Sequence, residues 1–324
     1  MPEVISVELH HIGLVPSDPE HLGRVLLEIV GASELPRSDG HRDFALGRTV
    51  LRLHDAALEE VPEDGRPLRY LALRAPDLGE VTARVEAAGL DAAKGRGRDG
   101  RGEILLRPEQ WGGIPLVVTD SALPGGDPGT AGERPTSGRK VDHVGVACED
   151  LQLVRDRFCG TLGLLKESEE TDTEMLVPVE QFTSDKYGSW MATQRRKAST
   201  SAIRALFVTL SDLELEFLED ADPDGGPTAG AAAASEGTEA PRGGSQGADS
   251  RVISRHIERF GPGLAHLAVA VPDVDTALRQ AHEAGAELVD SQGRGGARRS
   301  QIGFLHPRST GKLLIHFVEH PERW

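Results

Sequence analysis

Cysteine and aromatic residues are scarce in this chain of 324 residues. Its only cysteines are Cys148 and Cys159, and aromatic residues make up 4% of the sequence. Two thiols are too few for a disulfide-rich scaffold or for a zinc module built on four thiolates, so we expect both to be small buried side chains. No apolar run approaches the roughly 20 residues that cross a bilayer, and no secretory signal is visible at the N-terminus. We therefore expect a cytoplasmic protein without a membrane partner.

Basic residues are also fewer than acidic ones, with 36 Lys and Arg against 52 Asp and Glu. The formal net charge is -16, and no cluster of aromatic and basic residues offsets it. Such a chain would be repelled by a polyanionic backbone, which argues against nucleic acid as a partner. The length predicts roughly two domains, as a monomer or a homodimer.

Two segments lack the apolar content of a core and divide the chain. Residues 121–138 are rich in Gly, Pro, Ser and Thr and are typical of a linker. Residues 221–250 have a Gly, Pro, Ala and acidic composition that predicts a disordered insert. The expected domains are therefore residues 1–120 and 139–324, with the insert inside the second.

Between these segments the chain repeats itself. Each of four copies begins with an alternating apolar strand that leads into a helix capped by an acidic residue. The copies begin HHIGLVPSD at His10, RYLALRAPD at Arg69, DHVGVACED at Asp142 and AHLAVAVPD at Ala265. Asp77 is placed to cap the second helix, and Gly89 to end it. A segment from Arg251 to Gly261 predicts a further packing helix before the fourth copy.

Shorter strands follow each helix, so the repeating unit is predicted to be βαβββ. In the fourth copy these strands are AELVDS, QIGFLHP and KLLIHFVE. Two such units are expected to bury each other's sheet faces on either side of the linker. The predicted fold is α+β, with four tandem βαβββ modules paired into two domains.

Equivalent positions of the copies carry different residues in the two domains. The first strands hold His11, Tyr70, His143 and His266, and the last strands hold Arg52, Val117, Glu216 and His316. Only the second domain therefore presents three imidazoles and a carboxylate, which could meet at one point of a curved sheet. Nitrogen and oxygen donors of this kind suit a divalent Zn, Fe, Co, Ni or Mn ion.

With this repeat and these donor residues, the chain resembles the vicinal oxygen chelate superfamily. That superfamily includes glyoxalase I, extradiol dioxygenases, resistance proteins and methylmalonyl-CoA epimerase. Residues 140–320 are most similar to the epimerase. The similarity rests on KVDHVGVACEDL from Lys140, LSDLELEFLE from Leu210 and FLHPRSTG from Phe304. The first domain shows the fold pattern without epimerase motifs and looks like a degenerate duplicate.

The resemblance implies metal ligands at His143, Glu216, His266 and His316. Family members usually have glutamate at the last of these positions, where it also serves as an acid/base group. The resemblance further implies that two substrate oxygens chelate the metal while a base removes a proton from the adjacent carbon. His316 is the candidate base when it is not a ligand. Weaker candidates are Glu174, Glu180 and Asp185.

The leading hypothesis is a metal-dependent epimerase or isomerase that acts next to a carbonyl, with methylmalonyl-CoA as the candidate substrate. Arg308 and Lys312, which flank a Ser-Thr-Gly turn, would bind the phosphates of the coenzyme A tail. One alternative is an Fe(II)-dependent ring-cleaving or 2-oxo-acid dioxygenase of the same superfamily. A second is a non-enzymatic protein that sequesters a small molecule.

Overall fold

The computed structural model describes most of the chain. The described residues are 6–37, 40–55, 65–97, 100–124, 138–173, 179–184, 188–193, 203–220 and 252–320, of which 171–173, 179–184 and 188–193 are described by their backbone only. The predicted insert at 221–250 and most of the predicted linker lie outside these residues. The domain boundaries therefore stay a prediction.

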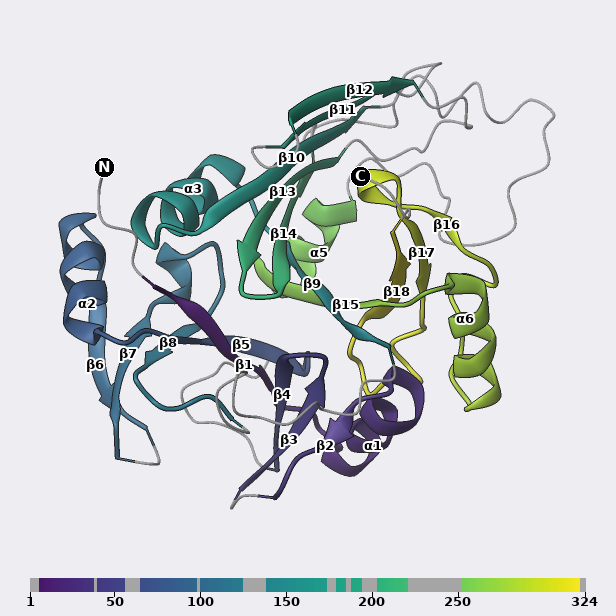
Figure 1. The fold of residues 1–324 in the computed structure, drawn as a ribbon, viewed down its shortest axis with the longest axis horizontal. Coiled ribbons are helices and arrows are strands. Elements are labelled where there is room, and N and C mark those ends of the chain that lie inside the picture. The colour runs from purple at the N-terminus through teal and green to yellow at the C-terminus, as the bar shows by residue number, and fades with distance from the viewer. Residues whose placement is uncertain are drawn as a thin grey trace.

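Two curled sheets make up the described part of the molecule (Figure 1). The first has eight strands in the order β2-β3-β4-β1-β5-β8-β7-β6. Its strands are β1 (Glu8–Leu14), β2 (Ser33–Glu34), β3 (His41–Leu46), β4 (Thr49–His54), β5 (Leu68–Arg74), β6 (Ala92–Arg96), β7 (Gly102–Leu106) and β8 (Leu116–Thr119).

The second sheet has ten strands among the described residues, in the order β12-β11-β10-β13-β14-β9-β15-β18-β17-β16. Its strands are β9 (Lys140–Ala147), β10 (Leu165–Thr173), β11 (Val179–Ser184), β12 (Gly188–Thr193), β13 (Ile203–Leu210), β14 (Leu213–Asp220), β15 (Gly263–Ala270), β16 (Arg294–Gly295), β17 (Gln301–Phe304) and β18 (Ile315–Glu319). The hairpin β11–β12 extends the third module beyond the predicted three strands after its helix.

The modules confirm the predicted α+β class, but they pair differently from expectation. The prediction that the two modules of a pair bury each other's sheet faces was wrong. The modules instead join edge to edge, because the first strands β1 and β5 pair antiparallel in one sheet and β9 and β15 do so in the other. Each last strand then runs parallel to its own first strand, as β14 does to β9 and β18 to β15. Four strands from two modules thus lie side by side at the centre of each sheet.

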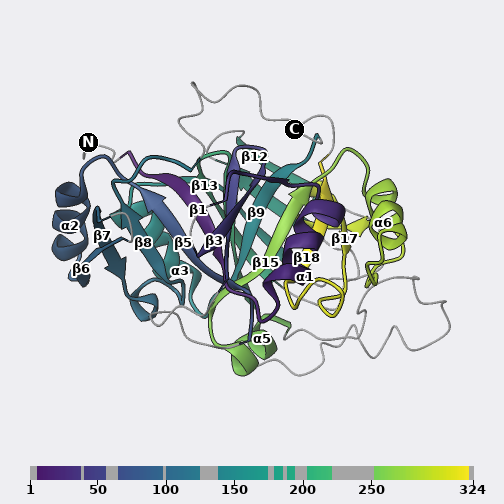
Figure 2. The same cartoon turned by 90° about the horizontal axis from the view of Figure 1, so that it is seen from below.

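The helices pack on these sheets. They are α1 (Pro19–Arg24), η1 (Val25–Val30), α2 (Leu78–Ala87), η2 (Pro108–Gln110), α3 (Leu151–Arg155), η3 (Asp156–Thr161), α5 (Val252–Phe260), α6 (Val274–Glu283) and η4 (Ala297–Arg299). The first and third modules share a further feature, since α1 and α3 each continue into a π-helical turn, η1 and η3. Figure 2 shows α2 and α6 at opposite ends of the molecule.

The predicted ends of α2 are confirmed. The Asp77 carboxylate accepts hydrogen bonds from the backbone N–H groups of Gly79 at 2.8 Å and Glu80 at 3.1 Å. Gly89 follows the helix with φ 72°, a left-handed conformation that favours glycine. The segment 286–291 was wrongly predicted to be a strand, because only an isolated bridge joins Leu288 to Leu305 there.

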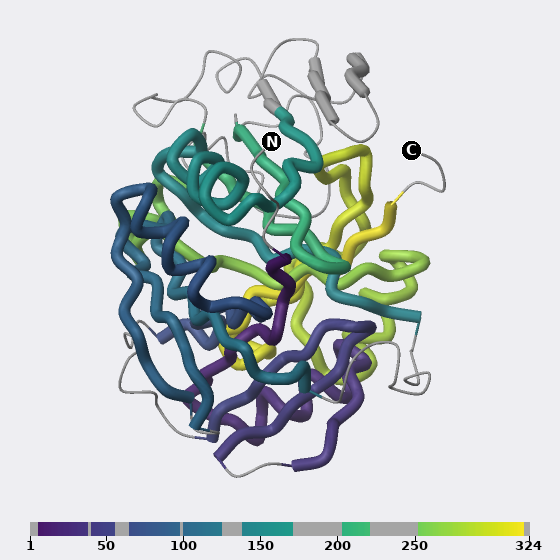
Figure 3. Tube along the Cα trace, turned by 60° about the vertical axis from the view of Figure 1, so that its left-hand side comes forward, coloured from purple at the N-terminus to yellow at the C-terminus, as the bar shows by residue number. Residues whose placement is uncertain are grey.

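Modules of the two sheets also contact each other across the molecule (Figure 3). The rings of Trp111 and Phe158 meet edge to face at 5.7 Å between centroids, which joins the second module to the third. The carbonyl oxygens of Leu264 and Phe260 each accept a hydrogen bond at 3.0 Å from the Arg66 guanidinium. Phe260 ends the predicted helix α5, which is confirmed and buries Ile253. Among the described residues, no helix has the length and apolarity needed to span a membrane.

Candidate metal centre

Four neighbouring strands at the centre of the ten-stranded sheet carry the side chains that the repeat aligned. Glu216 lies on β14, His143 on β9, His266 on β15 and His316 on β18. Glu216 and His266 are both in register with Gly145 of β9. His143 and His316 are both in register with Ala268 of β15, two residues beyond His266. The four groups therefore form two adjacent rows on the same face of the curled sheet.

The structure brings the four groups together. One ligand atom from each of His143, His266 and His316 lies within 4.8 Å of the others. Oε2 of Glu216 lies 3.3 Å from Nε2 of His143 and 3.2 Å from Nε2 of His266. Three imidazoles and a carboxylate therefore surround a common point, although their role as metal ligands stays a prediction.

Three ring nitrogens of these histidines have no hydrogen-bond partner by geometry among the described residues. Nε2 of His143, Nε2 of His266 and Nδ1 of His316 are buried without one. Glu216 is the near neighbour of two of these nitrogens, with Oε2 3.3 Å from Nε2 of His143 and 3.2 Å from Nε2 of His266. Buried polar atoms are nearly always paired, so imidazole nitrogens gathered around one carboxylate oxygen are a feature that a bound cation would satisfy. The donor set of nitrogen and carboxylate oxygen fits a divalent transition metal.

Burial and mutual contact set the protonation of the cluster. Burial opposes charge on every member, yet Glu216 and Asp142 raise the pKa of His143 to about 9. For Glu216, burial is outweighed by His143 and His266, which hold the pKa of its carboxyl well below the usual value. Burial together with the other two imidazoles depresses the pKa of His316 well below the usual range. The metal-free site therefore pairs a His143 cation with a Glu216 anion, and binding of a cation would release the proton of His143.

A glycine makes room for His266. A Cβ atom on Gly145 would lie 1.9 Å from Cε1 of the His266 ring, so no other residue fits without displacing that imidazole. Gly13 occupies the equivalent place in the first sheet, where a Cβ atom would lie 1.9 Å from the Tyr70 ring. The close approach of ring to backbone is thus part of both central strand pairs.

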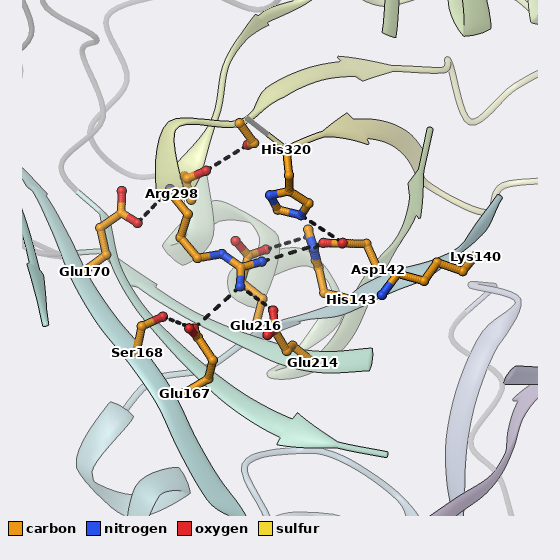
Figure 4. A network of polar contacts seen from close by, with 12 residues as sticks. Lys140, Asp142, His143, Glu167, Ser168, Glu170, Glu214, Glu216, Arg298 and His320 are labelled. Atoms are coloured by element: carbon orange, nitrogen blue, oxygen red, sulfur yellow. Dashed lines mark hydrogen bonds and ion pairs between the residues drawn. The ribbon is translucent and has the colours of Figure 1, made fainter. Parts of the chain in front are cut away.

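A second layer of charged groups lies behind His143 (Figure 4). Its Nδ1 is 2.8 Å from Oδ2 of Asp142, whose other oxygen is 2.8 Å from Nε2 of His320. The Arg298 guanidinium approaches Asp142 at 3.6 Å. Sequence reasoning missed this layer, although the available signal was the Asp-His pair itself in DHVGVACED.

Arg298 is a buried cation that the sequence did not single out. It is 5% exposed and lies among carboxylates. It forms an ion pair with Glu214, lies 3.5 Å from Glu167 and donates its backbone N–H to Glu170 at 2.9 Å. Its guanidinium also stacks over the Phe207 ring, 3.9 Å from the centroid.

The first sheet has a hydrogen-bonded network at the equivalent place. Nε2 of His11 and Nε2 of His54 each lie 2.9 Å from the Tyr70 hydroxyl. Arg52, which matches Glu216 in register, forms two hydrogen bonds of 2.8 Å with Asp43. Among the described residues, the only group arranged to hold a metal is the one formed by the second-domain histidines.

The remaining predicted site residues lie elsewhere. Arg308 and Lys312 are on the turn between β17 and β18, where the Arg308 side chain is 74% exposed and 3.6 Å from Glu287. Their predicted contact with coenzyme A phosphates stays a prediction. Glu174 and Asp185, two candidate bases, lie outside the described residues, as does the side chain of Glu180.

Comparison with known proteins places this chain in a family. A family model described as the Glyoxalase/Bleomycin resistance protein/Dioxygenase superfamily matches residues 142–304, just over half of the chain. The match includes His143, Glu216 and His266 and ends before His316. No curated protein matches the chain.

Solved structures agree on the fold of the whole chain. A variant of 4-hydroxymandelate synthase from Streptomyces coelicolor is 15% identical, with a TM-score of 0.60 over 98% of this chain and 93% of that one. The Mn(II)-bound glyoxalase from Novosphingobium aromaticivorans is 13% identical, with a TM-score of 0.54 over 98% of this chain and 83% of that one. Methylmalonyl-CoA epimerase from Mycobacterium tuberculosis is 23% identical over 56% of this chain and 87% of that one, but its TM-score of 0.35 is too low to add to the fold comparison.

The family match and the paired βαβββ modules agree with each other. The chain belongs to the Glyoxalase/Bleomycin resistance protein/Dioxygenase superfamily.

Proposed function

We propose that the protein is a metal-dependent epimerase or isomerase that moves a proton on a carbon next to a carbonyl group. The observation that carries the proposal is the meeting of His143, Glu216, His266 and His316 at one buried point. Three buried ring nitrogens without a hydrogen-bond partner support a metal there. The identity of the divalent ion is left open among Co, Ni, Mn, Fe and Zn.

A divalent metal bound here would act as a Lewis acid that stabilises negative charge on substrate oxygens. The protein supplies the donors and a proton acceptor. His316 is the proposed acceptor whenever it is not a ligand, because its imidazole is neutral, although the burial that lowers its pKa also makes it a weaker base. All four residues are between 3% and 7% exposed, and this burial would keep water away from a substrate carbon at the centre.

The number of donors favours isomerisation over dioxygenation. A six-coordinate metal with four protein donors has two open positions, enough for a substrate that binds through two oxygens. Dioxygenases need a further position for molecular oxygen, and the common non-haem iron site has three protein donors. That site is built from two histidines and one carboxylate, so the additional donor here is an imidazole. With His316 also bound as a ligand, the donor count argues against the dioxygenase alternative.

An acyl-CoA ester, with methylmalonyl-CoA as the first to test, is the proposed substrate. Support comes from the sequence similarity at residues 140–320 and from the exposed Arg308 on a turn that directly precedes β18. Arg308 and Lys312 would then bind the phosphates of the coenzyme A tail. A cytoplasmic location is proposed with this substrate.

The test is a screen of metal-loaded protein for exchange of the α-proton with solvent deuterium, across acyl-CoA esters and 2-oxo compounds. Deuterium at the α-carbon of methylmalonyl-CoA, lost in a Glu216→Ala variant, would support the proposal. Oxygen consumption with a 2-oxo acid or a catechol would establish the dioxygenase instead. Purified protein that retains no transition metal after metal loading would favour a protein that only sequesters a small molecule.

A further inference from the structure

His143 differs from the rest of the centre in the contact made by its second nitrogen. Nδ1 lies 2.8 Å from Oδ2 of Asp142, the preceding residue. An imidazole that donates its Nδ1 proton to a carboxylate keeps its Nε2 lone pair for a ligand, and the carboxylate makes that nitrogen more basic. Nε2 of His143 is the atom that faces Glu216 and the centre.

Neighbouring residues of a strand normally point to opposite faces, so this contact requires a local irregularity. The register between β9 and β15 shifts between the pairs Ala268–His143 and Val269–Val141, which places Asp142 at a β-bulge. Bulges re-aim side chains, and this one turns Asp142 toward the ring of His143. The first sheet has the same shift at His10, between Leu9 and His11.

Two basic side chains hold Asp142 from the far side. His320 contacts Oδ1 at 2.8 Å, and the guanidinium of Arg298 lies 3.6 Å from Oδ2 (Figure 4). Arg298 has a left-handed backbone with φ 52°, which is costly for a residue with a side chain. Its stacking on Phe207 and its contacts with Glu214 and Glu167 hold it there. The carboxylate of Asp142 is thus fixed by residues from the C-terminal module.

The first sheet provides an internal comparison. His10 stands at the place of Asp142, and its Nδ1 lies 2.6 Å from Nδ1 of His11. Burial lowers the pKa of His10 to about 4, so its neutral imidazole supplies no negative charge to His11. The sheet that has the histidine triad has the carboxylate, and the sheet that lacks the triad has an imidazole instead.

We infer that Asp142 is a positioning residue for the metal centre, held in place by His320 and Arg298. It orients His143 and strengthens Nε2 as a ligand. The inference rests on the part of the proposed function that concerns metal binding, and it is independent of which reaction follows. Asp142 contacts the nitrogen of His143 that faces away from the centre, so its effect is expected to appear in metal affinity.

The experiment compares the affinity of metal-free Asp142→Asn and unaltered protein for Co²⁺ and Zn²⁺, by competition with a chromophoric chelator. We expect binding to weaken about 10- to 100-fold, as is usual for carboxylates behind a metal-bound histidine. Zinc-loaded protein labelled with ¹⁵N-histidine gives a second readout. One hydrogen-bonded Nδ1–H resonance of a metal-bound ring should lose its low-field shift in the variant.

Asp43→Asn is the matched control, because Asp43 is a buried carboxylate of the first sheet paired with Arg52 and should leave metal affinity unchanged. If Asp142→Asn does not fold, His320→Gln replaces it, since the His320 side chain is 26% exposed and its loss removes one anchor of Asp142. A loss of affinity in the same direction is expected. Unchanged metal affinity in the folded variants would overturn the role of Asp142 but leave the proposed metal centre standing. Unaltered protein that binds neither metal would instead overturn the metal centre of the proposed function.

Discussion

His316 stands where glutamate is usual in the proteins that this chain resembles, and two roles are proposed for it. We expect His316→Ala to weaken metal binding at least about tenfold, because one donor of the centre is lost. His316→Glu should retain the metal, since a carboxylate also coordinates divalent ions. The measurement is metal content and affinity of both variants, beside α-proton exchange.

The pair of variants separates the two roles. Retained metal with equal or faster proton exchange in His316→Glu would show that position 316 transfers the proton. Equal metal affinity of His316→Ala and unaltered protein would contradict the assignment of this imidazole as a ligand.

Gly145 is the residue whose side chain must be absent for the centre to form. In Gly145→Ala the new Cβ would collide with the His266 ring, so the imidazole must move away from the other donors. We expect loss of metal binding and a decrease of about 1–3 kcal/mol in the free energy of unfolding, as is usual for overpacking. Chelator competition and denaturant unfolding measure the two effects.

Gly13→Ala is the control for that variant. It creates the same collision with Tyr70 in the first sheet and should lower stability to a similar extent, but metal affinity should not change. A similar loss of metal binding in both variants would show that the effect of Gly145→Ala is not local.

His10 gives a prediction for acid stability. Its pKa is lowered by burial to about 4, whereas an imidazole in the unfolded chain has a pKa near 6.5. Between these values the unfolded chain binds a proton that the folded chain does not, so stability is fully present above pH 6.5 and falls as the pH drops toward 4. The loss attributable to His10 is on the order of 3 kcal/mol at most.

The check is chemical unfolding of metal-free protein at several pH values, for unaltered protein and for His10→Gln. The difference between the two curves isolates His10 from the other histidines. A difference that does not change between pH 7 and pH 4 would contradict the assignment.

At the scale of elements, the helix α2 is predicted to depend on its cap. Asp77→Ala removes the acceptor for two backbone N–H groups and should cost about 1 kcal/mol of stability. Hydrogen exchange of the α2 amides and denaturant unfolding measure the effect. Glu86→Ala, at an exposed position of the same helix, should change stability by less than about 0.5 kcal/mol. Equal effects of the two variants would show that the cap contributes nothing.

Elements that begin each module were predictable, because alternation and an acidic cap are local properties. The strands that follow each helix were harder to predict from the sequence. Residues 286–291 alternate as a strand does, but Glu287 and Val289 bond to the segment around residues 304–306 without forming a ladder. The short strand β16 at Arg294–Gly295 takes the edge position instead. An edge strand pairs with one neighbour only. Which residues form it therefore depends more on the neighbouring strand than on the alternation of its own sequence.

At the scale of the whole molecule, metal binding should stabilise the second sheet more than the first. The donors come from four strands of two modules, so a metal that binds the folded chain alone adds about 2.7 kcal/mol at a concentration one hundred times its dissociation constant. We expect metal addition to raise the midpoint of thermal unfolding by roughly 5–10 °C, and a chelator to reverse the change.

Hydrogen exchange locates the effect. Amides of β9, β14, β15 and β18 should be protected by the metal, while those of β1 and β4 should change little. A Glu216→Ala variant is the control and should show a smaller shift. Equal protection of both sheets would contradict a centre confined to the second.

The sequence by itself determined the repeating module, because strand alternation, helix caps and repeat spacing are local properties of the chain. It also identified the four equivalent strand positions that carry the candidate donors, which are His143, Glu216, His266 and His316. Only the tertiary structure decided that the modules join edge to edge and that Asp142 meets His320 across a separation of 178 residues. It also decided that Arg298 is buried among carboxylates instead of solvated. The physical reason is that contacts between distant residues depend on strand register, on a bulge and on burial, and none of these follows from local pattern.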